Sequence, residues 1–199
     1  MKPLSGYKIA LTMIALSTLL SVSCASGTPA AKPKTYSAPP PMIIDTTKNY
    51  TATIETEKGN LVLELFASDV PITVNNFAFL AREGFYDGST FHRVIPDFMA
   101  QGGDPTGTGM GGPGYIFDNE ITEHTHVAGA LSMANAGADT NGCQFFITYK
   151  ARHELDGSYS VFGQLIEGMD VLESLTTRDP RENPDFAGDK IIRITITES

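Results

Sequence analysis

The sequence predicts a mainly β domain, a barrel or a sandwich, that carries two helices. Short stretches alternate apolar and polar residues, Gly, Pro, Asn and Asp separate them, and only two segments have helical spacing. Many short strands with few helices between them are typical of antiparallel architectures and not of a wound parallel sheet. The stretches that we expect to form strands are Thr51–Glu57, Asn60–Phe66, Thr90–Ile95, Phe98–Gln101, Ala128–Ala134, Gln144–Tyr149, Ser160–Leu165 and Lys190–Thr197.

Turn and helix signals connect these strands. Lys58-Gly59-Asn60 predicts a hairpin between the first two strands. A helix is expected to open at Asp69-Val70-Pro71, because Asp and Pro favour the first turn, and to end at Gly84. A second, shorter helix is expected over Gly168–Leu175.

Charge divides the chain into two parts. Residues 1–48 hold five Lys and a single acidic residue, Asp45, and therefore carry a net charge of +4. Because the whole chain carries −9, the remainder carries −13. A domain this acidic repels phosphate groups, so we expect no nucleic-acid partner.

The N-terminal residues have the pattern of a secretory signal peptide. Lys2 and Lys8 supply the positive charge, and Ile9–Val22 is an apolar stretch without a charged residue. This stretch is short for a transmembrane helix, and small residues follow it. We therefore expect residues 1–23 to form a signal peptide and the protein to be exported.

The end of this segment adds a possible lipid anchor. Leu20-Ser21-Val22-Ser23-Cys24 resembles the lipobox of bacterial lipoproteins, although Ser21 stands where Leu is usual. The resemblance implies that Cys24 is lipidated and holds the protein on a bacterial membrane, on the periplasmic side or at the cell surface. The alternative is an ordinary signal peptide cleaved near Ser23-Cys24-Ala25.

Residues 24–48 are rich in Pro, Ala, Ser and Thr, with one short apolar break at Met42–Ile44. Proline has no N–H for regular structure, and such a composition has little surface to bury. We expect a disordered linker here and a folded domain over residues 49–199.

Two segments depart from a plain strand pattern. Arg93, Gln101 and Gln144 stand among Phe and Met residues in stretches that otherwise alternate as strands. An apolar pocket with a few placed polar groups has this composition, as expected for a small-ligand or peptide site. A barrel rim with a snorkelling Arg has it too.

Four sequence blocks resemble those of the cyclophilins. The blocks, in chain order, are FHRVIPDFMAQGGD, LSMANAG, NGCQFFIT and LDGSYSVFGQL. The compact loop 103–115 is similar to that of bacterial members. The resemblance implies an eight-stranded antiparallel β-barrel capped by two α-helices, peptidyl-prolyl cis/trans isomerase activity, and no need for a cofactor or metal.

The resemblance also implies roles for individual residues. Arg93 matches the catalytic arginine of the family. The residues that it implies for substrate binding are Phe98, Met99, Gln101, Ala134, Asn135, Gln144, Phe146, Leu155 and Tyr159. Glu154 stands where the family often has Trp, and Tyr159 where it commonly has His, so we expect weak binding of cyclosporin-type cyclic peptides.

The chemistry of such a site is simple. A peptide bond resists rotation because of C–N resonance, with a barrier of ~18–20 kcal/mol. Rotation through a right angle leaves a lone pair on the prolyl nitrogen, and a guanidinium donates hydrogen bonds without losing its proton. Arg93 is expected to stabilise that twisted state.

Three weaker signals are set aside. Residues 107–112 satisfy G-x-G-x-x-G, but no strand leads into them and no helix is expected after them. His124 and His126 form an H-x-H pair without an evident third metal ligand. Cys143 is expected to be a small packing residue.

The expected partners are unfolded or exported polypeptides that contain proline, together with the membrane through the anchor. We expect a monomer that accelerates the folding of exported proteins. A proline-peptide binding module without catalysis is the alternative function.

Overall fold

The computed structural model describes Met1, residues 33–182 and residues 184–199. Cys24 and, Met1 apart, the predicted signal peptide lie outside the described residues. The chain divides into two units, of which Lys32–Ser199 contains all the helices and strands that the structure describes. No helix in these described ranges has the length and the apolar character that crossing a membrane requires.

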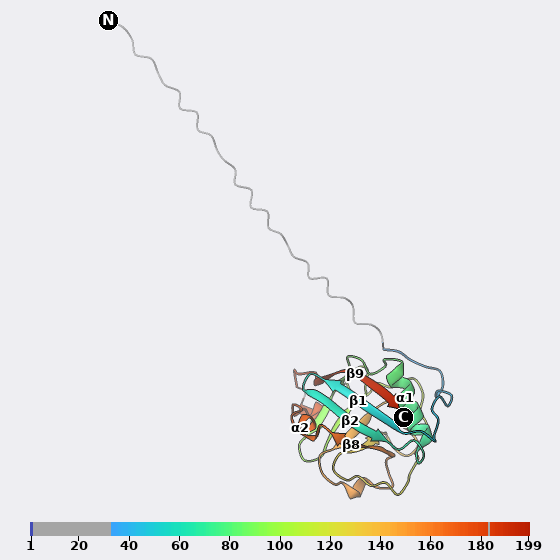
Figure 1. Ribbon diagram of the computed structural model, residues 1–199. Coiled ribbons are helices and arrows are strands. Elements are labelled where there is room, and N and C mark those ends of the chain that lie inside the picture. Colours follow the sequence, from blue (N-terminus) through green and yellow to red (C-terminus); the bar gives the residue numbers. More distant parts are fainter. Residues whose placement is uncertain (2–32, 183) are drawn as a thin grey trace. The chain divides into compact units, whose positions relative to one another are not determined.

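Nine antiparallel strands form a single sheet. Part of this sheet is seen in Figure 1. Their order across the sheet is β3-β9-β1-β2-β8-β6-β7-β5-β4. The strands are β1 (Tyr50–Thr56), β2 (Gly59–Leu65), β3 (Thr90–Phe91), β4 (Arg93–Ile95), β5 (Met99–Gly102), β6 (Ala130–Met133), β7 (Phe145–Thr148), β8 (Val161–Glu167) and β9 (Asp189–Glu198).

The two ends of the sheet meet at His92 and nearly close it into a barrel. Strands β3 and β4 stand at opposite ends of the strand order, yet only His92 separates them along the chain. The ladder breaks there because β3 pairs with β9, whereas β4 pairs with β5 and Val94 bridges to Arg178. The predicted barrel is therefore confirmed, and the expected single strand Thr90–Ile95 is two strands, which gives nine instead of eight.

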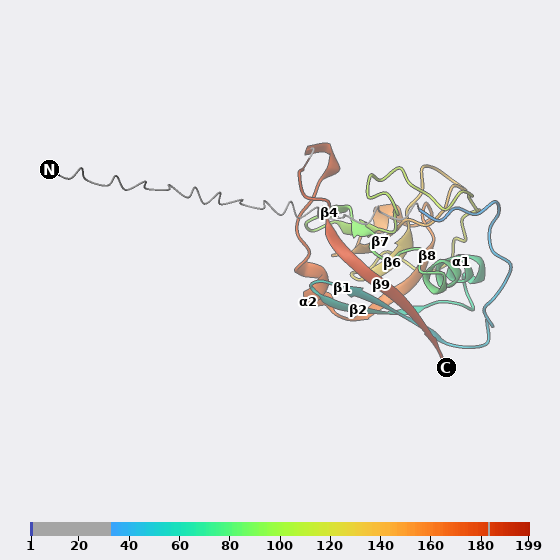
Figure 2. The same cartoon turned by 90° about the horizontal axis from the view of Figure 1, so that it is seen from above.

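The two helices lie at opposite sides of the barrel in both views (Figures 1 and 2). Helix α1 (Pro71–Arg82) buries Val74, Phe77 and Leu80 completely in the core. Helix α2 (Met169–Glu173) is a short element that buries Leu172. Short 3-10 turns cover His153–Leu155 and Pro180–Glu182.

The start of α1 is capped by a residue that local sequence does not indicate. Asp69, expected in the first turn, lies outside the helix and pairs with His124 at 2.7 Å. The Glu120 carboxylate instead accepts hydrogen bonds from the Ile72 N–H (3.1 Å) and the Thr73 N–H (2.7 Å). A carboxylate at this end stabilises the helix because it satisfies free N–H groups and faces the positive end of the dipole.

Residues 33–48 pack on the domain, which differs from the disordered linker expected for this stretch. The Tyr36 N–H donates to the Pro113 carbonyl (2.8 Å), and the Tyr36 ring meets that of Phe79 edge-on at 5.2 Å. The Ile43 N–H donates to the Asn75 side chain (2.7 Å), and Ile44 is buried. The composition of the segment predicts disorder, but the contacts of Tyr36, Ile43 and Ile44 hold the segment on the domain. We call residues 33–48 the strap.

Candidate active site

Strand register places the predicted polar residues on one line across the outer face of the barrel. Arg93 on β4 lies opposite Gln101 on β5, Gln101 opposite Phe146 on β7, and Phe146 opposite Ser132 on β6. Side chains of antiparallel partners project to the same face of a sheet. The adjacent line of partners faces inward and belongs to the hydrophobic core: Val94, Ala100, Ile147 and Leu131.

A small cavity of about 130 Å³ lies beside Arg93 on this face. The guanidinium carbon of Arg93 is 5.6 Å from the centre of the Phe98 ring, within the range of a cation–π interaction. The cavity combines one cation, two side-chain amides and several apolar walls, so it can hold a small apolar ring next to a hydrogen-bond donor. Its lining residues are Arg93, Phe98, Met99, Gln101, Ala134, Asn135, Phe146, Leu155 and Tyr159. We call this cavity the first pocket.

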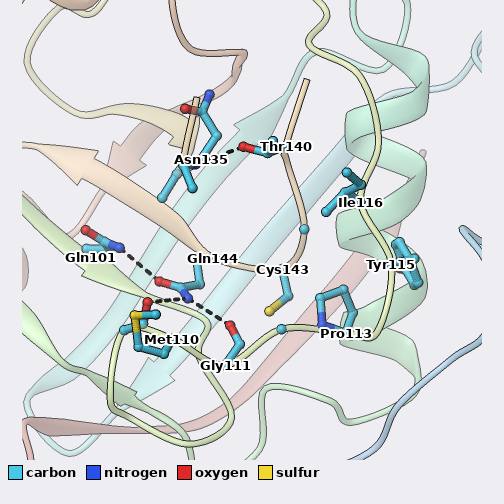
Figure 3. Close-up of a pocket in the computed structure, with 15 residues that line it drawn as sticks. Gln101, Met110, Gly111, Pro113, Tyr115, Ile116, Asn135, Thr140, Cys143 and Gln144 are labelled. Carbon is cyan, nitrogen blue, oxygen red and sulfur yellow. Dashed lines mark hydrogen bonds between the residues drawn. The ribbon is translucent and has the colours of Figure 1, made fainter. Parts of the chain in front are cut away.

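A second pocket of about 300 Å³ shares Gln101, Ala134 and Asn135 with the first pocket. Figure 3 shows its other walls, which come from the loop that includes Gly111 and Pro113 and from the chain around Cys143. Gln144 lines this second pocket and not the first. The structure therefore brings nine of the ten predicted side chains together around the first pocket and places Gln144 directly behind Gln101.

Hydrogen bonds set the orientation of these two amides (Figure 3). The Gln144 side-chain NH₂ donates to the carbonyls of Gly109 (3.1 Å) and Gly111 (2.8 Å), so the Gln144 oxygen must face the other way. That oxygen accepts from the Gln101 NH₂ at 2.9 Å. The chain of bonds leaves the Gln101 side-chain oxygen and one N–H for a ligand in the first pocket.

Asp104 organises the loop that supplies those carbonyls. Its buried carboxylate accepts from the Thr106 N–H (2.7 Å), the Gly109 N–H (2.5 Å) and the Gly111 N–H (3.0 Å). Burial raises the pKa of Asp104, but the hydrogen bonds from Thr106, Gly111 and Gly109 outweigh burial and leave the pKa below its usual value. Asp104 is therefore ionised at neutral pH and holds the loop in place.

The sequence analysis did not single out two arginines near the site. The Arg152 guanidinium carbon is 5.2 Å from the centre of the Phe98 ring, and its terminal nitrogen donates to the Asp97 carbonyl. Arg178 donates to the carbonyls of His92 and Phe186 and so holds the chain beside β4. Neither residue belongs to a matched block or a recognisable spacing, so only the fold reveals them.

One backbone group of Ala134 already has a hydrogen-bond partner within the barrel. Its N–H donates to the Gln144 carbonyl at 2.9 Å, so this group does not remain free for a peptide. Asn135, by contrast, places its side chain near the carbonyl of Ser158 (3.3 Å), which belongs to the loop before Tyr159.

The two departures from the family pattern differ in their effects. Tyr159 lines the first pocket and meets the Phe146 ring edge-on at 5.7 Å, so an aromatic wall is kept. Glu154 is absent from the lining of this pocket, and its side chain is 63% exposed and paired with Arg152. The side of the pocket that a Trp would cover is therefore open.

The signals set aside earlier have structural explanations. The thiol of Cys143 is buried, and burial raises its pKa to about 12, so it is a poor nucleophile. His124 pairs with Asp69 and His126 with Asp156. Within the described part of the chain, no group of three His, Cys, Asp or Glu residues is arranged to hold a metal ion.

A nearly closed antiparallel barrel with an arginine beside an apolar pocket on its outer face has the architecture of the cyclophilins. The model of the family described as "Cyclophilin type peptidyl-prolyl cis-trans isomerase/CLD" matches residues 51–197. The chain therefore belongs to the cyclophilin-type peptidyl-prolyl cis-trans isomerases, and its enzymatic activity is the isomerisation of X–Pro bonds.

Individual relatives agree with this assignment. A peptidyl-prolyl cis-trans isomerase of Synechococcus elongatus is 53% identical over 130 residues, which are 64% of this chain and 90% of the relative. Peptidyl-prolyl cis-trans isomerase B of Bacillus subtilis is 52% identical over 126 residues, 62% of this chain and 88% of the relative.

Solved structures of a cyclophilin-type isomerase from Cryptosporidium parvum have the same fold. One has a TM-score of 0.70 and 40% identity and covers 76% of this chain and 99% of its own. A second crystal structure, obtained in the presence of the dipeptide Ala-Pro, has a TM-score of 0.69 and 41% identity, with 75% and 99% covered.

Proposed function

We propose that this isomerase accelerates the folding of exported polypeptides from a lipid anchor at Cys24. Uncatalysed X–Pro isomerisation takes tens to hundreds of seconds, which is slow enough to limit folding. A signal peptide over residues 1–23 would bring the enzyme to the compartment in which exported chains fold, and a lipid on Cys24 would keep it at the membrane.

We further propose that Arg93 is the catalytic residue and that the first pocket holds the substrate proline. The observation that carries this proposal is the position of the Arg93 guanidinium, 5.6 Å from the Phe98 ring at the edge of an apolar cavity of about 130 Å³. The Ala-Pro dipeptide used with the Cryptosporidium relative supports a pocket of this kind for a prolyl residue.

The mechanism then follows from charge and geometry. Phe98, Met99 and Phe146 hold the proline ring still and exclude water, while the preceding carbonyl rotates. Arg93 donates a hydrogen bond to the prolyl nitrogen, whose lone pair develops only in the twisted state, so the bond is stronger there than in either planar state. Each tenfold gain in rate requires about 1.4 kcal/mol, which makes one charge-assisted bond a major contribution.

The Gln101 oxygen that remains free accepts an N–H of the substrate backbone, and the second pocket receives a side chain of a residue that flanks the proline. Both roles follow from the shared lining of the two pockets at Gln101, Ala134 and Asn135. No step requires a metal, a nucleophile or a proton transfer.

An isomerisation assay on a proline-containing tetrapeptide tests the role of Arg93. Arg93→Ala is expected to lower kcat at least about a hundredfold while the peptide still binds, because the lost bond forms only in the transition state. If the wild-type domain binds the peptide but does not accelerate exchange, the chain is a binding module and the proposed catalytic role is wrong.

Mass spectrometry of the mature N-terminus tests the anchor. The expected species begins at Cys24 and carries acyl chains, and Cys24→Ser should move the protein from the membrane to the soluble fraction. A mature protein that begins at Ser26 without lipid would overturn the proposal.

A further inference from the structure

His126 is completely buried beside the first pocket, and its backbone N–H and both ring nitrogens have hydrogen-bond partners. Its exposed fraction is 0%, and its Nδ1 lies 2.7 Å from an oxygen of Asp156. The same carboxylate oxygen accepts the backbone N–H of His126 at 2.8 Å. On the other side of the ring, Nε2 lies 3.1 Å from the Ser132 hydroxyl. Because a carboxylate only accepts hydrogen bonds, Nδ1 carries a proton and donates to Asp156.

These three residues have the bonding order of a catalytic Ser-His-Asp triad, but they cannot act as one. Ser132 is 0% exposed, and its hydroxyl donates its single hydrogen to the Ser160 carbonyl at 3.1 Å and not to His126. A nucleophile must reach a substrate, whereas this hydroxyl is completely buried. The arrangement therefore has a structural purpose, and its contacts with the pocket indicate which one.

The His126 ring supports two walls of the first pocket. It lies parallel to the Phe146 ring, with an interplanar angle of 7° and a centroid distance of 5.7 Å. It meets the Tyr159 ring edge-on at 6.3 Å, and Phe146 and Tyr159 also meet each other edge-on. The three rings form one packed set, so the orientation of His126 limits the orientation of the other two.

Asp156 connects the same cluster to a third wall. It follows Leu155, which lines the pocket from the 3-10 turn His153–Leu155. The second oxygen of Asp156 lies 3.0 Å from Nδ1 of His153, at the start of this turn. The Arg152 N–H also donates to the His126 carbonyl at 2.6 Å, so both ends of the turn are tied to His126.

We propose that His126 and Asp156 are positioning residues that hold Phe146, Tyr159 and Leu155 in the arrangement that binds the substrate proline. This inference rests on the proposed role of the first pocket. Neither residue lines that pocket, so both act through the walls and not on the substrate. Loss of the pair should loosen the pocket and weaken substrate binding more than it slows the bound substrate, because Arg93 and Gln101 stay in place.

The chain supplies a matched control on its surface. His124 pairs with Asp69 at the same distance of 2.7 Å, and its ring stacks on Phe66 at 3.9 Å. This second pair has the same chemistry but none of its residues lines either pocket. His124→Phe and Asp69→Asn should therefore leave KM and kcat unchanged.

The experiment measures KM and kcat for a proline tetrapeptide, together with the NMR-derived Kd of an Ala-Pro peptide. His126→Phe keeps an aromatic ring but loses both hydrogen bonds, and Asp156→Ala removes the acceptor. Each is expected to raise KM and Kd about tenfold and to change kcat less than about threefold. Asp156→Asn keeps an acceptor oxygen and should rescue most of the loss, and His126→Phe serves as the test if Asp156→Ala does not fold.

Thermal unfolding on the same samples separates positioning from stability alone. If the variants melt earlier but keep KM and Kd within twofold of wild type, the positioning role is overturned. If the wild type and the His124→Phe control do not accelerate exchange, the catalytic proposal fails instead, and the Kd values still decide whether His126 and Asp156 shape the pocket.

Discussion

Replacement of Asp104 by alanine is expected to destabilise the domain by about 3 kcal/mol and to lower kcat/KM about tenfold. Asp104 is fully buried and touches neither pocket, yet it holds the loop whose Gly109 and Gly111 carbonyls orient Gln144. Without the carboxylate, the loop should move and Gln144 should lose its fixed orientation. Gln101 would then be free to rotate, which raises KM.

The magnitude follows from the bonds that are lost. Three backbone N–H groups, those of Thr106, Gly109 and Gly111, donate to the carboxylate, and the Thr106 hydroxyl donates at 2.8 Å. A hydrogen bond to a charged group contributes about 1.5–3 kcal/mol. Most of the loop is partly exposed, so water replaces some of these bonds in the variant. The expected loss of folding free energy is therefore that of one or two such hydrogen bonds and not of all four.

Urea unfolding and tetrapeptide kinetics measure the two effects, with Asp45→Ala as the matched control. Asp45 accepts from the N–H (3.0 Å) and the hydroxyl (2.7 Å) of Thr47, as Asp104 does from Thr106, but Asp45 is exposed and far from Gln144 in the bonding network. The control should leave both the urea midpoint and the kinetics close to those of wild type, because water replaces the bonds of an exposed carboxylate. Equal losses in the two variants, or a tenfold kinetic loss in Asp45→Ala, would refute the reasoning.

Three further outcomes are expected. Glu154→Trp should cover the open side of the first pocket and strengthen the binding of a cyclosporin-type peptide about tenfold in calorimetry, and unchanged affinity would contradict this role of position 154. Burial lowers the pKa of His92, so the unfolded chain takes up this proton first as the pH falls. The associated stability is present above about pH 6.5, the ordinary pKa, and is lost as the pH falls toward the pKa of the folded state. Urea midpoints should therefore fall with acidification more steeply in wild type than in His92→Gln, and equal slopes would exclude His92 as the cause. Tyr36→Ala should lower stability by about 1–2 kcal/mol in thermal unfolding because the strap loses its ring contacts with Phe79, whereas Ser37→Ala should have no effect.

Local sequence patterns mispredicted two features, the packing of the strap on the domain and the carboxylate at the start of α1. Composition alone describes residues 33–48 as a linker, but Tyr36 finds an aromatic partner on α1, and Ile43 a hydrogen-bond partner at Asn75. Asp69 was expected in the first turn of α1, but it lies outside the helix, and Glu120, 48 residues away from Ile72, supplies the carboxylate. In both cases the decisive partner is distant in the chain, so no short window of sequence contains it.

The sequence by itself determined most of the strands and the position of the helices, and its resemblance to the cyclophilins indicated the side chains that line the first pocket. Strand alternation and turn residues act over a few neighbours, and the residues Arg93, Phe98 and Gln101 lie in one short block. Only the tertiary structure decided the remainder: closure of the sheet at His92, the orientation of Gln101 through Gln144, and the burial of His126. All three features depend on contacts between segments that are distant in the sequence and meet only when the barrel closes. Neighbouring residues in the chain therefore do not indicate which partners come together.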